Sequence, residues 1–195
     1  VKPQTIEAIH HAKAANVPTI VGISKIDKPD ADLKKVRNDL VSHNVVPEDW
    51  GGDTMFIPFS AKSGQGIDEL LEAILLQAEM LELEANHKGS CKGIVLESKL
   101  DKGRGPVATI LIQSGTLQQS NIILAGNEFG KIRLMSNDLG EKIKSATPAM
   151  PVEILGLSGL PSAGDNFMIF ENEKKARELA NSRKQKTREI QLSQR

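Results

Sequence analysis

The fold of this chain is decided by the stretch Val17-Pro18-Thr19-Ile20-Val21-Gly22-Ile23-Ser24-Lys25-Ile26-Asp27, in which a short apolar run ends in a polar turn. A second apolar run, Met55-Phe56-Ile57-Pro58-Phe59, ends in the polar turn Ser60-Ala61-Lys62. Apolar residues at helical spacing before, between and after these runs predict three helices. Helices alternating with two strands predict a parallel sheet with right-handed crossovers.

Local signals place the ends of these helices. Pro3 suits the first turn of the first helix, and Asp30 is expected to cap the second. The third helix opens after Gly66, follows an apolar stripe to about Glu84, and is expected to be the longest of the chain.

A sheet of two parallel strands is incomplete, because such strands normally have both faces covered and neighbours on both edges. No stretch of the sequence reads G-x-x-x-x-G-K-[ST], the loop that wraps a triphosphate. We therefore expect residues 1–86 to be the C-terminal part of a larger α/β domain.

Beyond Gly89 the sequence changes to short β-branched runs separated by turn residues. The runs that predict strands are 93–100, 106–113, 122–124, 131–135, 152–157 and 166–170. Several short strands without helices favour a closed β-barrel, here over residues 87–170. Residues 171–195 are charged and helical in pattern, with a surplus of basic side chains from residue 181 onward.

The composition excludes several classes of site. Lysine plus arginine equals aspartate plus glutamate at 25 each, so no overall charge indicates a nucleic-acid or membrane partner. Cys91 is the only cysteine and the four histidines share no ligand spacing with it, so no metal site is expected. No apolar run approaches the ~20 residues of a membrane span, and a cytoplasmic location is expected.

The two polar turns suit recognition of guanine. The Asp27 carboxylate can accept hydrogen bonds from the ring N1–H and the exocyclic amine, an edge that adenine lacks. The Lys25 stem can lie along the base, and the loop of Ser60, Ala61 and Lys62 can offer a backbone N–H to the guanine carbonyl. Each turn alone could be an ordinary surface turn; both at the carboxyl ends of parallel strands indicate a ligand site.

Two further motifs do not carry chemistry. Asp49-Trp50-Gly51-Gly52 matches D-x-x-G but lies between the two base-recognition turns, so a plain turn is expected. Gly103-Arg104-Gly105-Pro106-Val107-Ala108 resembles a dinucleotide-binding pattern, yet it opens a β run and predicts a hairpin loop. No residue is assigned a catalytic role.

The sequence resembles that of bacterial translation initiation factor 2, a family of translational GTPases. The resemblance rests on Lys25-Ile26-Asp27-Lys28-Pro29, on Leu100-Asp101-Lys102-Gly103-Arg104-Gly105-Pro106-Val107-Ala108-Thr109, and on residues 3–9, 47–52, 152–159 and 173–178. It covers nearly the whole chain. It implies a partial P-loop-GTPase-type sheet, then a translation-factor-type β-barrel, then the start of a linker helix.

The resemblance also implies a function. The family uses GTP or GDP with magnesium, helps place initiator tRNA on the small ribosomal subunit, and promotes subunit joining. By resemblance, this chain lacks the phosphate loop, both switches and the C-terminal domain that holds the initiator tRNA. Catalysis and tight nucleotide binding by this chain alone are therefore not expected; its own partners would be the upstream half of the GTPase domain and small-subunit RNA.

Two points concern particular residues. Ser24 stands where the family motif N-K-x-D has asparagine, which could remove a hydrogen bond of ~1 kcal/mol. The barrel's implied role is docking on ribosomal RNA, and the residues that could contact phosphates are Lys99, Lys102, Arg104, Lys131 and Arg133. Alternatively, these charges only keep the barrel soluble.

The leading interpretation is thus a piece of a translation initiation GTPase that supplies guanine-recognition loops and a ribosome-docking barrel. The alternative is a free-standing barrel adaptor that binds RNA or protein and retains a relic α/β portion. A complete small-molecule enzyme has little support, because no acid-base or nucleophilic set emerges.

Overall fold

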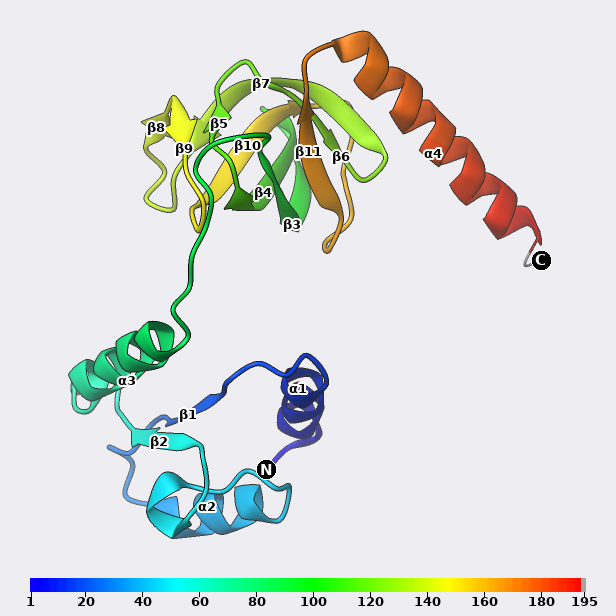
Figure 1. Ribbon diagram of the computed structural model, residues 1–195. Helices are drawn as coiled ribbons and strands as arrows, with labels where there is room; N and C mark the ends of the chain where they lie inside the picture. Colours follow the sequence, from blue (N-terminus) through cyan, green and yellow to red (C-terminus); the bar gives the residue numbers. More distant parts are fainter. Residues whose placement is uncertain (194–195) are drawn as a thin grey trace. The chain divides into compact units, whose positions relative to one another are not determined.

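The computed structural model describes residues 1–193, and the chain forms two compact units. The first unit is Val1–Leu83, and the second begins at Glu84 and contains both the barrel and the final helix (Figure 1). Each unit is described here by itself.

The first unit contains a two-stranded parallel sheet. Its strands are β1 (Ile20–Ile23) and β2 (Met55–Pro58), paired in register from Ile20 opposite Met55 to Ile23 opposite Pro58. The helices are α1 (Pro3–Ala14), α2 (Leu33–Val41) and α3 (Ile67–Met80). The predicted parallel pairing is confirmed.

Two expectations about the helices were wrong. Asp32, not Asp30, caps α2: its Oδ1 accepts a hydrogen bond from the Lys35 amide at 2.9 Å, because the helix begins only at Leu33. The longest helix is α4 (Glu173–Ser193) with 21 residues, whereas α3 has 14 and ends at Met80.

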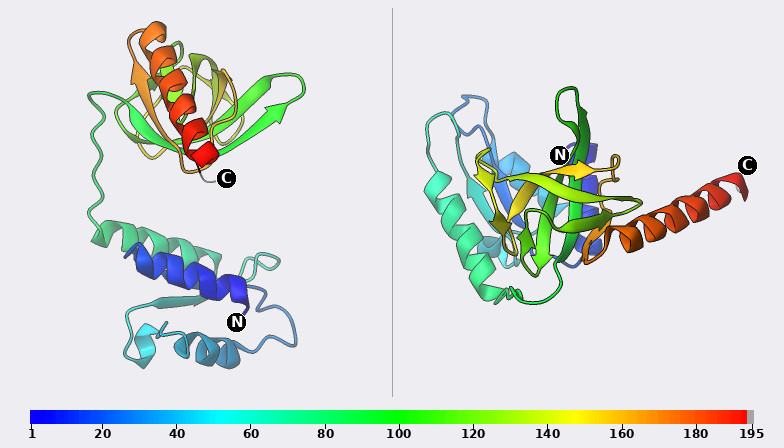
Figure 2. Two further views of the ribbon diagram at one scale, coloured as in Figure 1. Left: turned by 90° about the vertical axis from the view of Figure 1, so that its right-hand side faces the viewer. Right: turned by 90° about the horizontal axis from the view of Figure 1, so that it is seen from above.

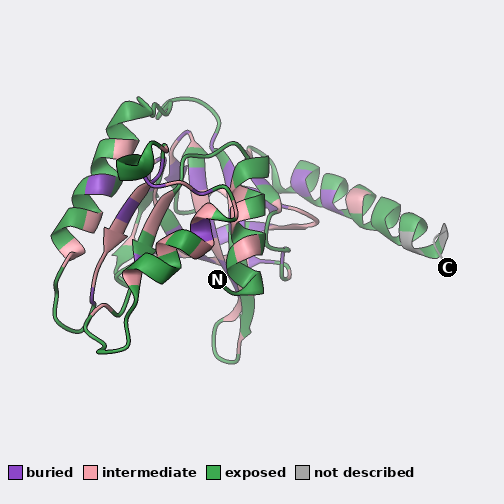
Figure 3. Cartoon of the chain, turned by 90° about the horizontal axis from the view of Figure 1, so that it is seen from below, coloured by how far each residue is buried: buried purple, intermediate pink, exposed green. Residues whose placement is uncertain are grey.

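The first unit has a thin core. Ile23, Leu40, Val45 and Phe56 form its buried cluster. On α3 only Ala73 is buried, whereas Leu75 is 69% exposed in spite of its apolar side chain. Figure 3 shows the helices of the first unit coloured mostly as exposed. The small core and the exposed apolar helix face are typical of an incomplete α/β layer.

The second unit is a closed barrel. Strand order β10-β4-β3-β11-β6-β7 returns to β10, so each strand of the ring has two hydrogen-bonded neighbours. The ring strands are β3 (Lys92–Asp101), β4 (Gly105–Ser114), β6 (Ile122–Ala125), β7 (Glu128–Ser136), β10 (Pro151–Leu157) and β11 (Asn166–Phe170). The predicted barrel is confirmed. The sequence patterns missed the two-residue strands β5 (Leu117–Gln118), β8 (Lys142–Ile143) and β9 (Ser145–Ala146).

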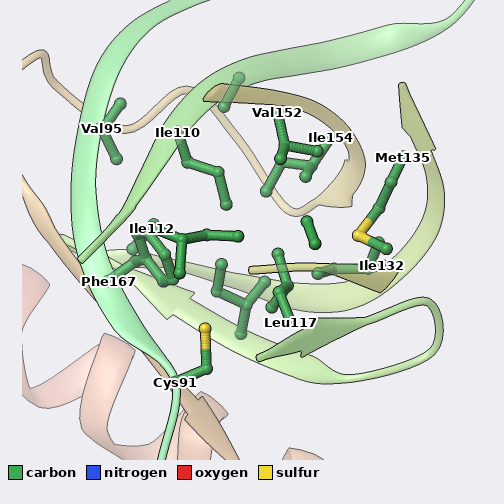
Figure 4. Packing of buried hydrophobic residues seen from close by; sticks show 14 of the residues in the cluster. Cys91, Val95, Ile110, Ile112, Leu117, Ile132, Met135, Val152, Ile154 and Phe167 are labelled. Atoms are coloured by element: carbon green, nitrogen blue, oxygen red, sulfur yellow. The ribbon is translucent and has the colours of Figure 1, made fainter. Parts of the chain in front are cut away.

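Inward-facing side chains fill the barrel (Figure 4). Ile110, Ile154 and Phe167 are at most 1% exposed. The Phe167 ring packs where Gly93 has no side chain; a Cβ there would collide with this ring and with the Leu111 carbonyl. This close approach explains the glycine within a strand.

The two motifs set aside from the sequence are turns. Residues 102–104 connect β3 to β4 in a hairpin, whose green tip projects from the barrel in Figure 2. Residues Glu48–Trp50 form a short 3₁₀ helix closed by Gly51, which has a positive φ of 84°. In the part of the chain that the structure describes, no helix is both long and apolar enough to span a membrane.

Candidate guanine-recognition site

The site is built from the loops that follow β1 and β2 at the carboxyl ends of the parallel strands. The Phe59 amide donates to the Ile23 carbonyl at 2.8 Å, and the Ile26 amide donates to the Phe59 carbonyl at 3.5 Å. These bonds continue the strand pairing into the loops. The two polar turns therefore lie side by side.

The Ser60 hydroxyl connects the loops directly. It donates a hydrogen bond to Asp27 Oδ1 at 2.6 Å and accepts one from the Ser63 amide at 3.2 Å. Ser60 is 0% exposed, whereas Asp27 is exposed. The hydrogen bond from Ser60 therefore fixes the position of Asp27 Oδ1. Asp27 Oδ2 has no hydrogen-bond partner among the described residues and can accept from a ligand.

The second loop presents its backbone outward. The Gly64 amide donates to the Ser60 carbonyl at 2.9 Å, and the Ser60 amide donates to the Gln65 carbonyl at 2.8 Å. Ala61 and Lys62 lie on the outer side of this closed turn and are exposed. Within residues 1–193 their amides donate to no acceptor, which leaves them available to a carbonyl oxygen.

The first loop contains a strained residue. Lys25 has a φ of 63°, in the left-handed region that favours glycine, and its carbonyl accepts from the Lys28 amide at 3.2 Å. Ser24 and Lys25 are exposed and line a cavity of ≈ 250 Å³ on the α2 side of the loop. Asp27 and the second loop do not line this cavity.

The structure therefore brings together the predicted residues Ser24, Lys25, Asp27, Ser60, Ala61 and Lys62 at one end of the sheet. The hydroxyl of Ser60 faces Asp27 instead of solvent, and this contact was missed from the sequence. A serine that directly follows a buried strand is the signal that could have suggested it.

The candidate RNA-contacting residues lie on two parts of the barrel. On the β3–β4 hairpin, Arg104 pairs with Glu153 at 2.7 Å and with Asp101 at 3.2 Å, and Lys99 lies 3.9 Å from Glu153. Lys102 is exposed at the hairpin tip. The charges of Lys99 and Arg104 are thus partly offset within the barrel.

The hairpin tip is organised by Asp101. Its Oδ1 accepts from the amides of Gly103 and Arg104, both at 2.9 Å, and these bonds together with the Arg104 guanidinium lower the pKa of the Asp101 carboxyl. The carboxylates of Glu153 and Asp101 in turn raise the pKa of Arg104.

Lys131 and Arg133 are exposed on β7. Arg133 and Arg104 line the same groove of ≈ 410 Å³ on the barrel, with Pro106 and Leu155 among its apolar residues. The structure thus brings Arg104 and Arg133 together, whereas Lys131 does not line this groove.

Nothing in the described residues suggests a metal site, since no group of three His, Cys, Asp or Glu side chains converges. Cys91 is fully buried, and burial raises the pKa of its thiol to about 11, so it is not a nucleophile at neutral pH.

Two family models match the chain. The model of the Elongation factor Tu GTP binding domain matches residues 1–80, and that of Elongation factor G domain 2 matches residues 90–170. Among solved structures, GDP-bound aIF5B from Aeropyrum pernix is 26% identical with a TM-score of 0.66 and covers 96% of this chain and 40% of that chain. Apo SelB from Methanococcus maripaludis, at 23% identity and a TM-score of 0.65, covers 88% and 38% and shows the fold alone.

Curated relatives are closer in sequence. Translation initiation factor IF-2 of Francisella tularensis subsp. holarctica is 60% identical over 194 residues, and that of Francisella philomiragia is 59% identical. In both, the match covers 100% of this chain but only 23% of the relative's length. The identity over the full chain and the two domain matches show that the chain belongs to the family of bacterial translation initiation factor IF-2.

Proposed function

We propose that this chain supplies the guanine-recognition half of a GTPase domain and a ribosome-docking barrel to a longer translation initiation factor. In that protein, GTP or GDP binds with magnesium, initiator tRNA is placed on the small ribosomal subunit, and the subunits then join. Initiator tRNA is held by a further C-terminal domain. The location of the protein is the cytoplasm, where ribosomes are.

The observation that carries the proposal is the contact between Ser60 and Asp27. It fixes the orientation of the carboxylate, whose oxygens can still accept from the N1–H and the amine of guanine, while the Ala61 amide, which donates to no acceptor among the described residues, can meet the guanine carbonyl. By resemblance to the family, the Lys25 stem is expected to lie along the base. These acceptors and this donor on adjacent loops support the proposal of a guanine site.

The exposed apolar face of α3 supports a second part of the proposal. Leu71 and Ile74 flank the buried Ala73 and are 53% and 48% exposed. β1 is bonded to a single neighbour within the described residues. We infer that the upstream half of the GTPase domain adds strands beside β1 and covers this flank of α3, and that it brings the phosphate loop and switches.

Base specificity tests the guanine site. In the longer protein, Asp27→Asn replaces an acceptor with a group that can also donate, so affinity for GDP should fall and affinity for xanthosine diphosphate, which has an oxygen in place of the amine, should rise. Calorimetric titration with both nucleotides measures this. Equal loss of both affinities, or no change in either, would contradict the assignment.

The chain alone should not hydrolyse GTP, because phosphate and magnesium contacts supply most of the binding and the chemistry. We expect no turnover and at most millimolar GDP affinity in calorimetry. Robust GTP hydrolysis by this chain that Asp27→Ala abolishes would contradict the proposal that phosphate binding and hydrolysis belong to the upstream half of the GTPase domain.

The barrel's docking is tested by charge reversal. Lys102 and Arg133 are exposed and lack acidic partners among the described residues, so Lys102→Glu and Arg133→Glu should each weaken sedimentation with the small subunit and reduce its salt dependence. The matched control is Lys34→Glu on α2, an exposed cation outside the barrel. Equal effects of all three variants would point to net charge instead of a docking surface.

A further inference from the structure

The final helix packs on the barrel along one narrow face. α4 follows β11 after two residues and contacts β6, β7 and β11 (Figure 1). Ala176 and Ala180 are both 0% exposed. Their small side chains, one helical turn apart, let the helix backbone lie close to the strands.

The same face continues into polar contacts with a single turn of the barrel. Arg183 donates to the Gly126 carbonyl at 2.8 Å, Lys184 pairs with Glu128 at 2.8 Å, and Asn127 donates to the Thr187 hydroxyl at 3.5 Å. Gly126, Asn127 and Glu128 are consecutive and lie at the β6–β7 turn.

Glu128 is itself held in place. Its Oε2 accepts a hydrogen bond from the Ser158 hydroxyl at 2.7 Å, and the Phe129 carbonyl accepts from the Ser158 amide at 2.7 Å. The Glu128 side chain is 15% exposed. Both carboxylate oxygens are therefore engaged, one toward the barrel and one toward α4.

A further contact lies about two turns nearer the start of the helix. The Arg177 guanidinium lies 5.5 Å from the centre of the Phe129 ring and also pairs with Glu173 at 3.0 Å. Hence Phe129 and Glu128, neighbours on β7, contact α4 at two positions about two helical turns apart.

We propose that the β6–β7 turn clamps α4, so that the barrel and residues 173–187 move as one rigid arm. The clamp consists of Gly126, Asn127 and Glu128 against Arg183, Lys184 and Thr187. This inference is independent of nucleotide and ribosome binding. An isolated helix of this length and polarity is marginal in water, so loss of the clamp frees or melts the arm.

Distance measurements between two spin labels test the clamp. Labels go on Gln113→Cys in β4 and Gln185→Cys on α4, both exposed positions. The native Cys91 is fully buried and stays unlabelled. Double electron–electron resonance of this labelled chain should give one narrow distance distribution.

The clamp variant is Glu128→Gln combined with Arg183→Ala, and the matched control is Lys186→Ala, an exposed cation two residues beyond Lys184 whose side chain forms no hydrogen bond or ion pair with the described residues. The distribution should broaden severalfold in the clamp variant and stay narrow in the control. Far-UV and near-UV circular dichroism check that the barrel still folds. Adding ~1 M salt to the unmodified chain, which shortens the screening length to about 3 Å, should also broaden the distribution.

Three results would overturn the proposal. A broad distribution in the unmodified chain would mean that α4 is not docked. An unchanged narrow distribution in the clamp variant would mean that the alanine contacts suffice. Equal broadening in the clamp variant and the control would mean that the helix responds to the loss of any cation on α4, and not specifically to the loss of its contacts with the β6–β7 turn.

Discussion

The hydrogen bond between Ser60 and Asp27 shows what a single hydroxyl contributes to the candidate site. The sequence identified both residues as members of adjacent loops, because both follow apolar runs. It could not show that Ser60 is buried and points at the carboxylate, because that depends on how the loop closes through its bonds to Gly64 and Gln65.

Replacing Ser60 therefore tests whether its hydroxyl positions the Asp27 carboxylate for binding guanine. In the longer protein, Ser60→Ala should lower GDP affinity roughly fivefold, the equivalent of a lost hydrogen bond of about 1 kcal/mol. Calorimetric titration measures the change. Ser63→Ala, which removes a hydroxyl whose only hydrogen bond among the described residues is a 3.4 Å bond from the Gln65 amide, is the control and should have little effect. Similar losses in both variants would contradict a specific role for Ser60.

A second residue-scale prediction concerns backbone strain in the barrel. Ala149 has a φ of 68° and an exposed side chain, so glycine at this position relieves strain without removing a contact. Ala149→Gly should raise the free energy of unfolding by about 0.5–1 kcal/mol in urea denaturation. Ala163→Gly, at an exposed turn position without positive φ, should instead be neutral or destabilising; the opposite order of the two variants would refute the strain argument.

Among the helices and strands, the sequence predicted those whose residues show a regular apolar pattern bounded by turn residues. The sequence predicted β1, β2 and the six ring strands, most of them to within one residue of their observed ends; β1 begins three residues after the start of its predicted run, and β7 begins three residues before the start of its run. The two-residue strands were not, because their pairing comes from neighbouring segments and leaves no periodic pattern. The misplaced cap at Asp30 has a similar cause, since two aspartates precede α2 and only the backbone decides between them.

The β3–β4 hairpin has a pH dependence that follows from Asp101. Its pKa is lower in the folded chain than in the unfolded chain, so ionisation favours the ordered tip above the ordinary pKa. That contribution is lost as the pH falls through the lowered folded value. Amide exchange at Gly103 and Arg104 should therefore gain protection from acidic pH toward neutral.

Asp101→Asn separates charge from geometry in this hairpin. The asparagine oxygen can still accept both amides, so the tip should remain ordered while its pH dependence disappears; Asp101→Ala should leave the tip disordered at every pH. Nuclear magnetic resonance of the tip amides distinguishes these cases. An unchanged pH dependence in Asp101→Asn would assign the titration to another group.

For the whole molecule, the two units should differ in stability. Fifteen buried apolar residues form the barrel cluster, against four in the cluster of the first unit, counted over the described residues. Because stability follows apolar burial, urea should unfold the first unit at lower concentration.

The single tryptophan makes this measurable. Trp50 belongs to the first unit, so its fluorescence should change in the earlier transition, while circular dichroism should show both. Ile154→Ala in the barrel should move only the later transition to lower urea concentration, because it lowers the free energy of unfolding of the barrel by about 2–5 kcal/mol. Coincident transitions by both probes would show that the units unfold together.

The closed ring of the barrel has a consequence for misassembly. Every ring strand already has two hydrogen-bonded neighbours, whereas β1 and β2 each have one open side within the described residues. Backbone groups on an open side can template added chains. Fibrils grown from this chain should therefore be seeded by the segments Ile20–Ile23 and Met55–Pro58. The barrel should remain folded in these fibrils and lie outside their cross-β core.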